Sequence, residues 1–527
     1  MRAQVLDQLA NRTFDLLVIG GGITGMGIAQ DAAARGMQVA LADKSDFAGG
    51  TSSKSSKLIH GGLRYLQQLD IAVTRESCRE RNLLRQLAPG LVEPLQFLMP
   101  LFRYQFKSLL FSAGLIAYDR LAGVAKPAER HRRVGRAEVL RLAPCMNADK
   151  VTAGLLYYDA ITDDARLTLT VARSAERHGA VLSNYVQVIH LLKFGSQVCG
   201  AMVHDLIHDR KFEIKARAVV NAGGVWIDAV RHMDRKDSPA LVYPAMGIHI
   251  TIPQEKLPVE TAIVIPSAHD RRLLFVIPWL GVTVIGTTDT PYQGPLDQPQ
   301  AAAQDVDYVI DAVNDAFSVG LARKDLISTY AGLRPLIGKN SRSTADVSRR
   351  HRVFESESGL LTIAGGKLTT YRSMAADIVD RVARRLSVRV PCRTQAIVLV
   401  DPWNNTGDAL AAPAPDIGAH LRQVYGAEAA IILDWVEENP GLCERLISAL
   451  PYIKAEVVYA VRRESAMTLE DVLARRTRIL LQDRSQGMVC APTVADLMAT
   501  ELGWGEARRD QQLRDYADYA RRHRPPE

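Results

Sequence analysis

Long hydrophobic runs and paired cysteines are both missing from this sequence, and their absence excludes several classes of protein. No window contains the roughly 18 consecutive apolar residues that indicate a transmembrane helix, and the longest candidate, 108–118, is about two-thirds of a span. The six cysteines of the 527-residue chain are scattered without a C-x-x-C pair. A disulfide framework and a metal site are therefore not expected, and the thiols are expected to be reduced and mostly buried in a cytosolic protein.

The sequence also lacks a strong charge imbalance, internal repeats and an N-terminal signal pattern. Its formal net charge of +7 is mild for this length and permits an anionic partner, such as a membrane surface or a phosphorylated substrate. The basic residues are spread along the chain and no paired cysteines are present, so no nucleic-acid partner is predicted. With 47% hydrophobic and 23% charged residues, the chain is expected to form two or three soluble globular domains.

A glycine-rich motif near the N-terminus is framed by the elements that a dinucleotide site requires. Residues 16–19 are predicted to form a buried strand, which breaks into Gly20, Gly22 and Gly25, in G-x-G-x-x-G spacing, at the start of a helix. A second strand, 38–42, ends in Asp43, about 20 residues past the glycines. The glycines let the backbone approach a pyrophosphate at the positive helix end, and the carboxylate holds a ribose. This framing favours a dinucleotide site over a glycine-rich turn without a ligand.

The next segment, 47–66, is rich in small and hydroxyl residues, carries three cations and closes on leucines. It is predicted to be a loop that wraps around a bulky polyanionic cofactor. Its run Gly-Thr-Ser-Ser-Lys-Ser-Ser-Lys-Leu-Ile-His-Gly-Gly-Leu-Arg-Tyr-Leu, at 50–66, closely resembles a signature of the FAD-dependent glycerol-3-phosphate dehydrogenases. A second stretch, 464–477, resembles the C-terminal domain of the same family.

The resemblance implies an α/β fold with a glutathione-reductase-like FAD-binding Rossmann domain, an inserted antiparallel-sheet substrate domain and a C-terminal all-α domain. It implies noncovalently bound FAD and oxidation of sn-glycerol 3-phosphate to dihydroxyacetone phosphate. A hydride would leave C2 for flavin N5, and the electrons would pass to membrane quinone. Two alternatives stay open: an oxidase that hands its electrons to oxygen, and an FAD-bound sensor without turnover.

The pattern of strands and helices indicates how the chain is divided. Buried strands that break on Gly-Gly at 216–226 and 359–372 are expected to return to the cofactor sheet, and β-rich runs within 241–335 indicate an antiparallel sheet. Residues 76–145 are expected to be rich in helix, and 418–522 to be helical throughout, after a linker. The predicted parts are FAD-binding (1–75, 145–240 and 340–395), substrate-binding (76–144 and 241–339) and C-terminal helical (400–527).

The predicted FAD contacts come from the glycine motif, the serine loop and the two Gly-Gly turns. A helix that starts after the last turn would aim its N–H groups at the flavin and stabilise the charge of the reduced ring. The residues predicted to bind FAD are Gly20, Gly21, Gly22, Ile23, Thr24, Gly25, Asp43, Lys44, Thr51, Ser52, Ser56, Lys57, Leu58, Gly223, Gly365, Gly366, Lys367 and Leu368.

The reaction requires guanidinium groups for a phosphate dianion, a base near neutrality for the C2 hydroxyl and a cation for the flavin. Arg334 and Arg349 match family positions that hold the substrate phosphate, and His249 matches an active-site histidine that we interpret as the base. The other predicted catalytic residues are the family's active-site lysine, Lys367, the substrate-side pair Arg64 and Tyr65, and His60, a second candidate for the base or for a contact at the flavin edge.

Two departures from the family pattern bear on the substrate. Many members read Arg-x-x-Lys-Gly-x-His where this chain has Tyr243, Met246 and His249, so two cations are missing beside the histidine. Asp43 replaces the more usual glutamate and has a shorter reach to the same ribose. The flavin prediction survives both changes, whereas the environment of the substrate phosphate is altered.

The segment 101–116 combines aromatic rings with arginine and lysine. One interpretation is a half-buried amphipathic helix, and the other is a helix that docks on the headgroup boundary of an anionic membrane. The second predicts a cytoplasmic protein, peripheral on the inner face of the cell membrane, where quinone is available. Among partners, a homodimer stays an open alternative, because no sequence feature specifies the oligomeric state.

Overall fold

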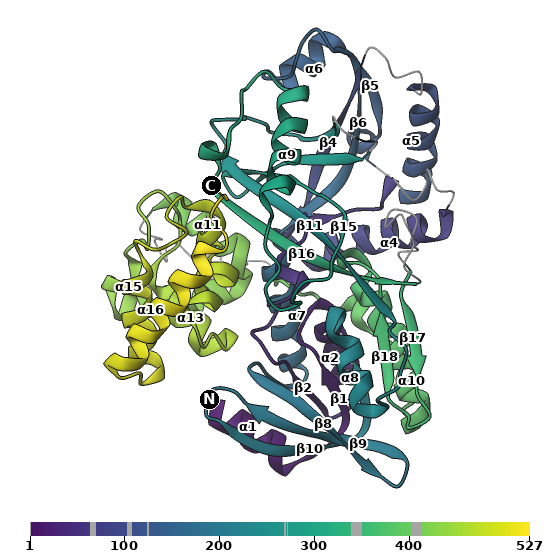
Figure 1. Ribbon diagram of the computed structural model, residues 1–527, viewed down its shortest axis with the longest axis vertical. Helices are drawn as coiled ribbons and strands as arrows, with labels where there is room; N and C mark the ends of the chain where they lie inside the picture. Colours follow the sequence, from purple (N-terminus) through teal and green to yellow (C-terminus); the bar gives the residue numbers. More distant parts are fainter. Residues whose placement is uncertain are drawn as a thin grey trace.

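The computed structural model describes residues 2–63, 70–102, 108–123, 126–267, 270, 272–338, 350–401 and 414–526. These residues form two mixed sheets, one in the lower and one in the upper half of Figure 1, with a helical domain beside them. The predicted α/β class with a C-terminal helical domain is confirmed.

The first sheet is built around the strand of the glycine motif. Its strands are β1 (Thr13–Ile19), β2 (Val39–Ala42), β7 (Val181–Ser183), β8 (Val186–Phe194), β9 (Gln197–Asp205), β10 (Arg210–Asn221), β17 (Arg352–Glu355) and β18 (Leu361–Ala364). β1 lies between β2 and β10 and is parallel to both, and β10 is parallel to β18 on its other side. The predicted returns of the chain to this sheet are therefore confirmed, since β10 and β18 each end just before a Gly-Gly turn.

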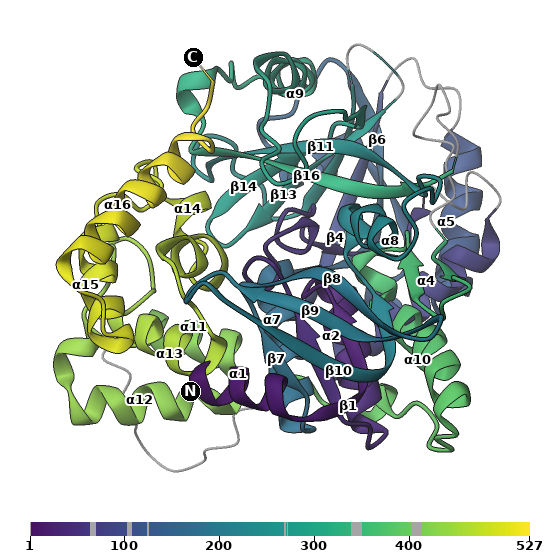
Figure 2. The same cartoon turned by 60° about the horizontal axis from the view of Figure 1, so that its bottom comes forward.

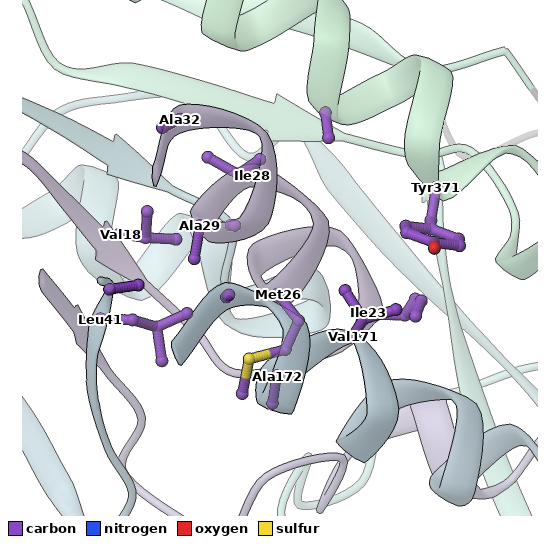
Figure 3. Close-up of a cluster of buried hydrophobic side chains, with 14 of the residues drawn as sticks. Val18, Ile23, Met26, Ile28, Ala29, Ala32, Leu41, Val171, Ala172 and Tyr371 are labelled. Atoms are coloured by element: carbon purple, nitrogen blue, oxygen red, sulfur yellow. The ribbon is translucent and has the colours of Figure 1, made fainter. Parts of the chain in front are cut away.

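Helices cover both faces of this sheet. They are α1 (Arg2–Asn11), α2 (Ile23–Ala34), α7 (Asp164–Arg177), α8 (Ile227–Asp234) and α10 (Tyr371–Leu386). Figure 3 shows α2 enclosed in the core, with Val18 and Leu41 of the sheet on one side and Val171 of α7 on another. A Cβ added at Gly27 would lie 2.7 Å from the ring of Tyr371, so α10 packs tightly on α2. This packing fixes the N-terminus of α2, where the glycine motif lies.

The second sheet carries the predicted substrate side. Its strands are β3 (Leu58–Ile59), β4 (Val92–Phe102), β5 (Arg132–Gly135), β6 (Val151–Thr162), β11 (Val242–Pro253), β12 (Ala262–Pro266), β13 (Leu273–Trp279), β14 (Val282–Gly286), β15 (Thr290–Pro291) and β16 (Ser328–Ile337). β11 lies between β14 and β16 and is antiparallel to both. Helix α9 (Ala303–Ala316) packs its valines against one face. The pairs among β11 to β16 are antiparallel, as predicted for 241–335, whereas β12 is parallel to β4 and makes the whole sheet mixed.

The prediction for residues 76–145 is only partly right. Helices α4 (Ile71–Leu87), α5 (Ser108–Ala122) and α6 (Arg136–Leu142) are present, but Val92–Phe102 is an 11-residue strand. This run is almost continuously apolar, and periodicity alone does not separate a buried strand from a buried helix. Its prolines lie at 94 and 100, positions that a helix interior disfavours.

The C-terminal domain packs along one side of both sheets (Figure 2). Its elements are α11 (Pro415–Tyr425), α12 (Ala429–Glu438), α13 (Lys454–Glu464), a π-helix (Asp471–Arg476), α14 (Ile479–Gln482), α15 (Ala491–Leu502) and α16 (Glu506–Arg521). The main-chain N–H of Asp471 donates to Thr468 Oγ1 at 3.3 Å, and that of Thr468 donates to Asp471 Oδ2 at 3.1 Å. The capping box expected from Thr468-Leu-Glu-Asp471 is therefore present.

The exact division of the chain into three parts stays a prediction. β3 and β6 fall within ranges assigned to the FAD-binding part, yet both are hydrogen-bonded in the second sheet. The chain therefore passes from the first sheet, at β2, to the second sheet, at β3, through the serine loop, so this loop connects the two sheets.

Candidate active site

The glycine motif forms a tight turn between β1 and α2. Gly20 has a φ of +109°, and a Cβ there would lie 2.7 Å from the carbonyl oxygen of Ala222. A Cβ at Gly25 would lie 1.8 Å from the carbonyl oxygen of Gly20, so both positions require glycine for packing. Gly22, the N-cap of α2, differs: a Cβ there would meet only Ser52 Oγ, at 3.2 Å. The turn therefore leaves space in front of the helix N-terminus, which fits a bound pyrophosphate.

Asp43 lies at the end of β2, directly beside this turn. Its carboxylate accepts hydrogen bonds from the main-chain N–H of Gly21 and from the main-chain N–H and hydroxyl of Ser45, the last two at 2.7 and 3.0 Å. Burial raises the pKa of Asp43 above its ordinary value, although these hydrogen bonds act in the opposite direction. Asp43 thus braces the glycine turn, and its contact with a ribose stays a prediction.

The serine loop closes over the helix N-terminus. Ser52 Oγ accepts from the main-chain N–H of Ile23, which begins α2, at 2.9 Å. The hydroxyl of Thr51 donates to the carbonyl of Leu333 in β16, at 2.6 Å. The loop therefore links the cofactor turn of the first sheet to a strand of the second.

The charge of Lys57, in this loop, is fully buried with a partner. Its ammonium group donates to both carboxylate oxygens of Asp164, at 2.8 and 2.9 Å, and to the carbonyl of Ser53. Burial, together with the charge of the nearby Arg478, lowers the pKa of Lys57 to about 8. With its side chain engaged in this way, a contact of Lys57 with FAD would come from its main chain.

His249 lies in β11 with its ring buried and stacked on that of Tyr330, 4.8 Å between centroids. Its Nε2 is hydrogen-bonded to Ser56 Oγ at 2.8 Å, and its Nδ1 has no hydrogen-bond partner among the described residues. Burial, together with the charges of Lys57 and Arg334, holds the pKa of His249 well below its ordinary value. The imidazole is therefore neutral at pH 7 and has a lone pair that can accept a proton, but a pKa this low makes it a weaker base than the near-neutral one that the reaction favours.

Arg334 lies in the neighbouring strand, β16, paired in register with Ala245 of β11. Its guanidinium donates to Asp289 Oδ1 at 3.1 Å, to Thr287 Oγ1 at 2.9 Å and to the carbonyl of Thr288 at 3.1 Å. These contacts hold the planar group in one orientation, and about a quarter of the side chain (24%) is exposed. Such a group can present a fork to an anion.

A second group of predicted residues lies around the last Gly-Gly turn. Gly365 and Gly366 both have positive φ, and Lys367 donates to Ser77 Oγ of α4 at 3.0 Å. His60 is bound through its main-chain N–H to Thr369 Oγ1 at 3.2 Å. Burial lowers the pKa of His60 to about 4. His60 is thus a neutral group beside the turn, as an alternative base would have to be.

The remaining predicted residues are placed as follows. Lys44 forms an ion pair with Asp297 and lies 4.5 Å from the centroid of the Trp226 ring. Thr24 lies in the first turn of α2, Leu58 in β3, Gly223 in the turn after β10 and Leu368 in a 3-10 turn before α10. Arg64, Tyr65 and Arg349 lie outside the described residues. Arg350, which follows Arg349 in the chain, forms an ion pair with Asp70 at 2.8 Å.

Sequence reasoning missed the glycines that make room for His249 and Arg334. A Cβ at Gly286 of β14 would lie 2.4 Å from the His249 ring, and one at Gly247 would lie 2.3 Å from the Arg334 guanidinium. A glycine inside a predicted strand often marks such a close approach, and this signal was present in both runs. Asp289, the partner of Arg334, had no comparable signal.

Comparison with known proteins identifies the family of the chain. Residues 15–372 match the family described as FAD dependent oxidoreductase, and 392–509 match the C-terminal domain of alpha-glycerophosphate oxidase. The chain is 40% identical over 528 residues to glycerol-3-phosphate dehydrogenase 2 of Mycobacterium tuberculosis, covering 98% of this chain and 89% of that protein. It is 35% identical over 538 residues to the human mitochondrial glycerol-3-phosphate dehydrogenase, covering 97% and 74%.

A solved structure extends the similarity to the whole fold. The X-ray structure of the glycerol-3-phosphate dehydrogenase from Bacillus halodurans complexed with FAD is 31% identical and has a TM-score of 0.82. The match covers 99% of this chain and 97% of that one. The chain therefore belongs to the family of FAD-dependent glycerol-3-phosphate dehydrogenases.

Proposed function

We propose that this flavoprotein oxidises sn-glycerol 3-phosphate to dihydroxyacetone phosphate and passes the electrons to membrane quinone. The observation that carries the proposal is the placement of neutral His249 and oriented Arg334 on adjacent strands, beside Ser56 of the serine loop. When bound, FAD supplies a hydride acceptor at N5 for the hydride that leaves C2. The glycine turn and Ser52 would hold its pyrophosphate at the N-terminus of α2.

In this proposal each residue acts on one part of the substrate. Arg334 binds the phosphate, because a guanidinium fork matches phosphate oxygens. His249, on the adjacent strand β11, takes the proton of the C2 hydroxyl at Nε2, the nitrogen that Ser56 contacts. Lys367, held near α4, is proposed to stabilise negative charge at the cofactor, and Arg64, Tyr65 and Arg349 stay predicted substrate residues.

The proposal is tested most directly by anaerobic titration of the purified protein with glycerol 3-phosphate. Bleaching of the flavin absorption band supports substrate oxidation, and a band that persists excludes it in favour of a sensor without turnover. Oxygen uptake without added quinone then separates the oxidase from the quinone reductase. Fast peroxide formation would identify oxygen as the electron acceptor. Slow oxygen uptake with rapid reduction of a quinone analogue would identify quinone as the acceptor.

Arg334→Ala should lower kcat/KM for glycerol 3-phosphate far more than kcat/KM for glycerol. Losing one charge-assisted phosphate contact costs about 1.5–3 kcal/mol, which is roughly 10- to 150-fold in kcat/KM. Asp289→Asn, which leaves the arginine but removes its ionic partner, serves as the matched control and should cause a smaller loss. Equal losses for glycerol and glycerol 3-phosphate in Arg334→Ala would show that Arg334 is not a phosphate ligand.

We also propose that the protein docks on an anionic membrane through the region of α4 and α5. Among the described residues, no helix is both long and apolar enough to span a bilayer, so access to quinone requires surface binding. Ile71 of α4 is 53% exposed and Ile116 of α5 is 41% exposed. Leu101, at the start of the predicted docking segment, is buried in β4 and is excluded from it, and residues 103–107 lie outside the described part.

Replacing Ile71 and Ile116 together by serine should release the protein from anionic vesicles. Both side chains are exposed, so folding and reduction of a soluble dye should be unaffected, while electron transfer to membrane quinone slows. Flotation with vesicles of anionic lipid, at low and high salt, measures the binding. Undiminished flotation of the folded double variant would place the docking surface elsewhere, and Phe194→Ser, at an exposed hairpin tip, is the control for losing an apolar side chain.

A further inference from the structure

The loop that follows β2 meets the C-terminal domain through a buried carboxylate. Asp46 is 1% exposed and accepts hydrogen bonds from Arg475 Nε at 2.5 Å and from two nitrogens of Arg476, one of them at 3.0 Å. Both arginines lie in the π-helix and are 2% exposed. Asn184 Nδ2 also donates to Asp46, at 3.0 Å, and to the carbonyl of Ser465 at 2.7 Å. Asp46 thus joins the cofactor sheet to the C-terminal domain.

A second arginine contact holds the other end of the same loop. Arg478 donates to Asp164 Oδ1 at 2.9 Å and to the carbonyl of Ser53 at 3.2 Å. Asp164 also forms an ion pair with Lys57 and accepts a hydrogen bond from the main-chain N–H of Ser55 at 2.8 Å. The loop is therefore fixed at three of its residues by a network that contains Arg478.

The loop does not determine its own conformation. Ala48 and Lys57, on either side of the 3-10 turn Thr51–Ser53, both have a φ of +61°. This left-handed conformation is uncommon for residues other than glycine and persists where surrounding contacts impose it. Burial would raise the pKa of Asp46, but Arg476 and Arg475 outweigh this effect and hold it below its ordinary value, so Asp46 is charged and attracts both arginines.

We propose that Arg475, Arg476 and Arg478 are positioning residues for FAD, through which the C-terminal domain holds the serine loop closed over the N-terminus of α2. This inference rests on the proposed placement of FAD on that loop. The contact that depends on it is the hydrogen bond between Ser52 Oγ and the main-chain N–H of Ile23, where a pyrophosphate would lie. Because coupling between two sites is reciprocal, bound FAD would stabilise the docked C-terminal domain by the same free energy.

Asp46→Asn tests the proposal, because it keeps the shape of the side chain and removes the charge. We expect the rate of FAD release from the holoenzyme, followed by the rise of free-flavin fluorescence, to increase at least tenfold. Amide hydrogen exchange at 50–58 and at 471–478 should increase together. Ile432→Ala, in a separate core of the C-terminal domain, is the matched control for lost stability and should change the release rate less than twofold.

Equal acceleration of FAD release by Asp46→Asn and by Ile432→Ala, at matched loss of melting temperature, would overturn the proposal. Unchanged release by folded Asp46→Asn would also overturn it. If Asp46→Asn does not fold, Arg475→Lys is measured by the same criterion, since it keeps a cation but loses the planar fork. Gly22→Val separates the two proposals: if that variant keeps FAD, the placement of FAD on this turn fails; if it releases FAD while Asp46→Asn does not, only the positioning role fails.

Discussion

Gly22→Val should give a folded, colourless protein that binds no FAD. The N-cap backbone of Gly22 has a φ of −77° and a ψ of 176°, which any L-residue adopts, and a Cβ would meet only Ser52 Oγ at 3.2 Å. We therefore expect the fold to accommodate the Cβ with a small shift of Ser52, while the branches of valine fill the space in front of the helix N-terminus. Absorbance at the flavin band, per folded protein measured by circular dichroism, reports the loss.

Gly25→Ala provides the contrasting control at the same turn. Its Cβ would lie 1.8 Å from the carbonyl oxygen of Gly20, so the turn itself would have to rearrange. We expect Gly25→Ala to lower the melting temperature of the FAD-free protein, whereas Gly22→Val should not. A Gly22→Val protein that retains stoichiometric FAD would show that the pyrophosphate lies elsewhere.

His249→Ala should lower the rate of flavin reduction by glycerol 3-phosphate about 10²- to 10⁴-fold, as expected for a lost general base. The FAD content should stay unchanged, because His249 contacts the serine loop only through Ser56 Oγ. Stopped-flow absorbance under anaerobic conditions measures the reduction rate. Ser56→Ala, which removes only the hydroxyl, should cause a smaller loss than removal of the base.

The pH profile distinguishes His249 from an ordinary histidine. A base whose pKa lies well below 6.5 is already deprotonated near neutrality, so the acid limb of kcat/KM, which reports the free enzyme, should appear well below pH 6.5. The same limb should disappear in His249→Ala. If reduction stays fast in His249→Ala but stops in His60→Ala or Lys367→Ala, the base belongs to the second group of residues around the last Gly-Gly turn.

The sequence predicted the cofactor turn because its signals are local. The glycines, the strand before them and Asp43 after them lie within about 30 residues, the length of a single βαβ unit. The later returns of the chain at 216–226 and 359–372 carry the same strand and Gly-Gly pattern, and the structure places both in the same sheet. The histidine and arginine candidates came from the family resemblance and lie on adjacent strands.

The features that were missed depend on pairs of residues far apart in the chain. Asp289 faces Arg334 from 45 positions away, and Asp46 faces Arg476 from 430 positions away. A single charged residue has no periodicity that indicates its partner, so neither ion pair is visible in the sequence. The strand Val92–Phe102 was missed for another reason: it is buried along most of its length and does not alternate.

The span between Asp46 and Arg476 also bears on how the chain is synthesised. A ribosome that adds about 5–20 residues per second needs roughly 20 to 90 s to complete this interval. Until then the arginine partners of the cofactor loop do not exist, and β18, the last strand added to the central parallel set, emerges only at Leu361–Ala364. The nascent protein must therefore keep β1 without β10 until Arg210–Asn221 has been made, and β10 without its parallel neighbour β18 until Leu361–Ala364 has been made. Such a high contact order favours slow, late folding and dependence on chaperones that shield unpaired strand edges.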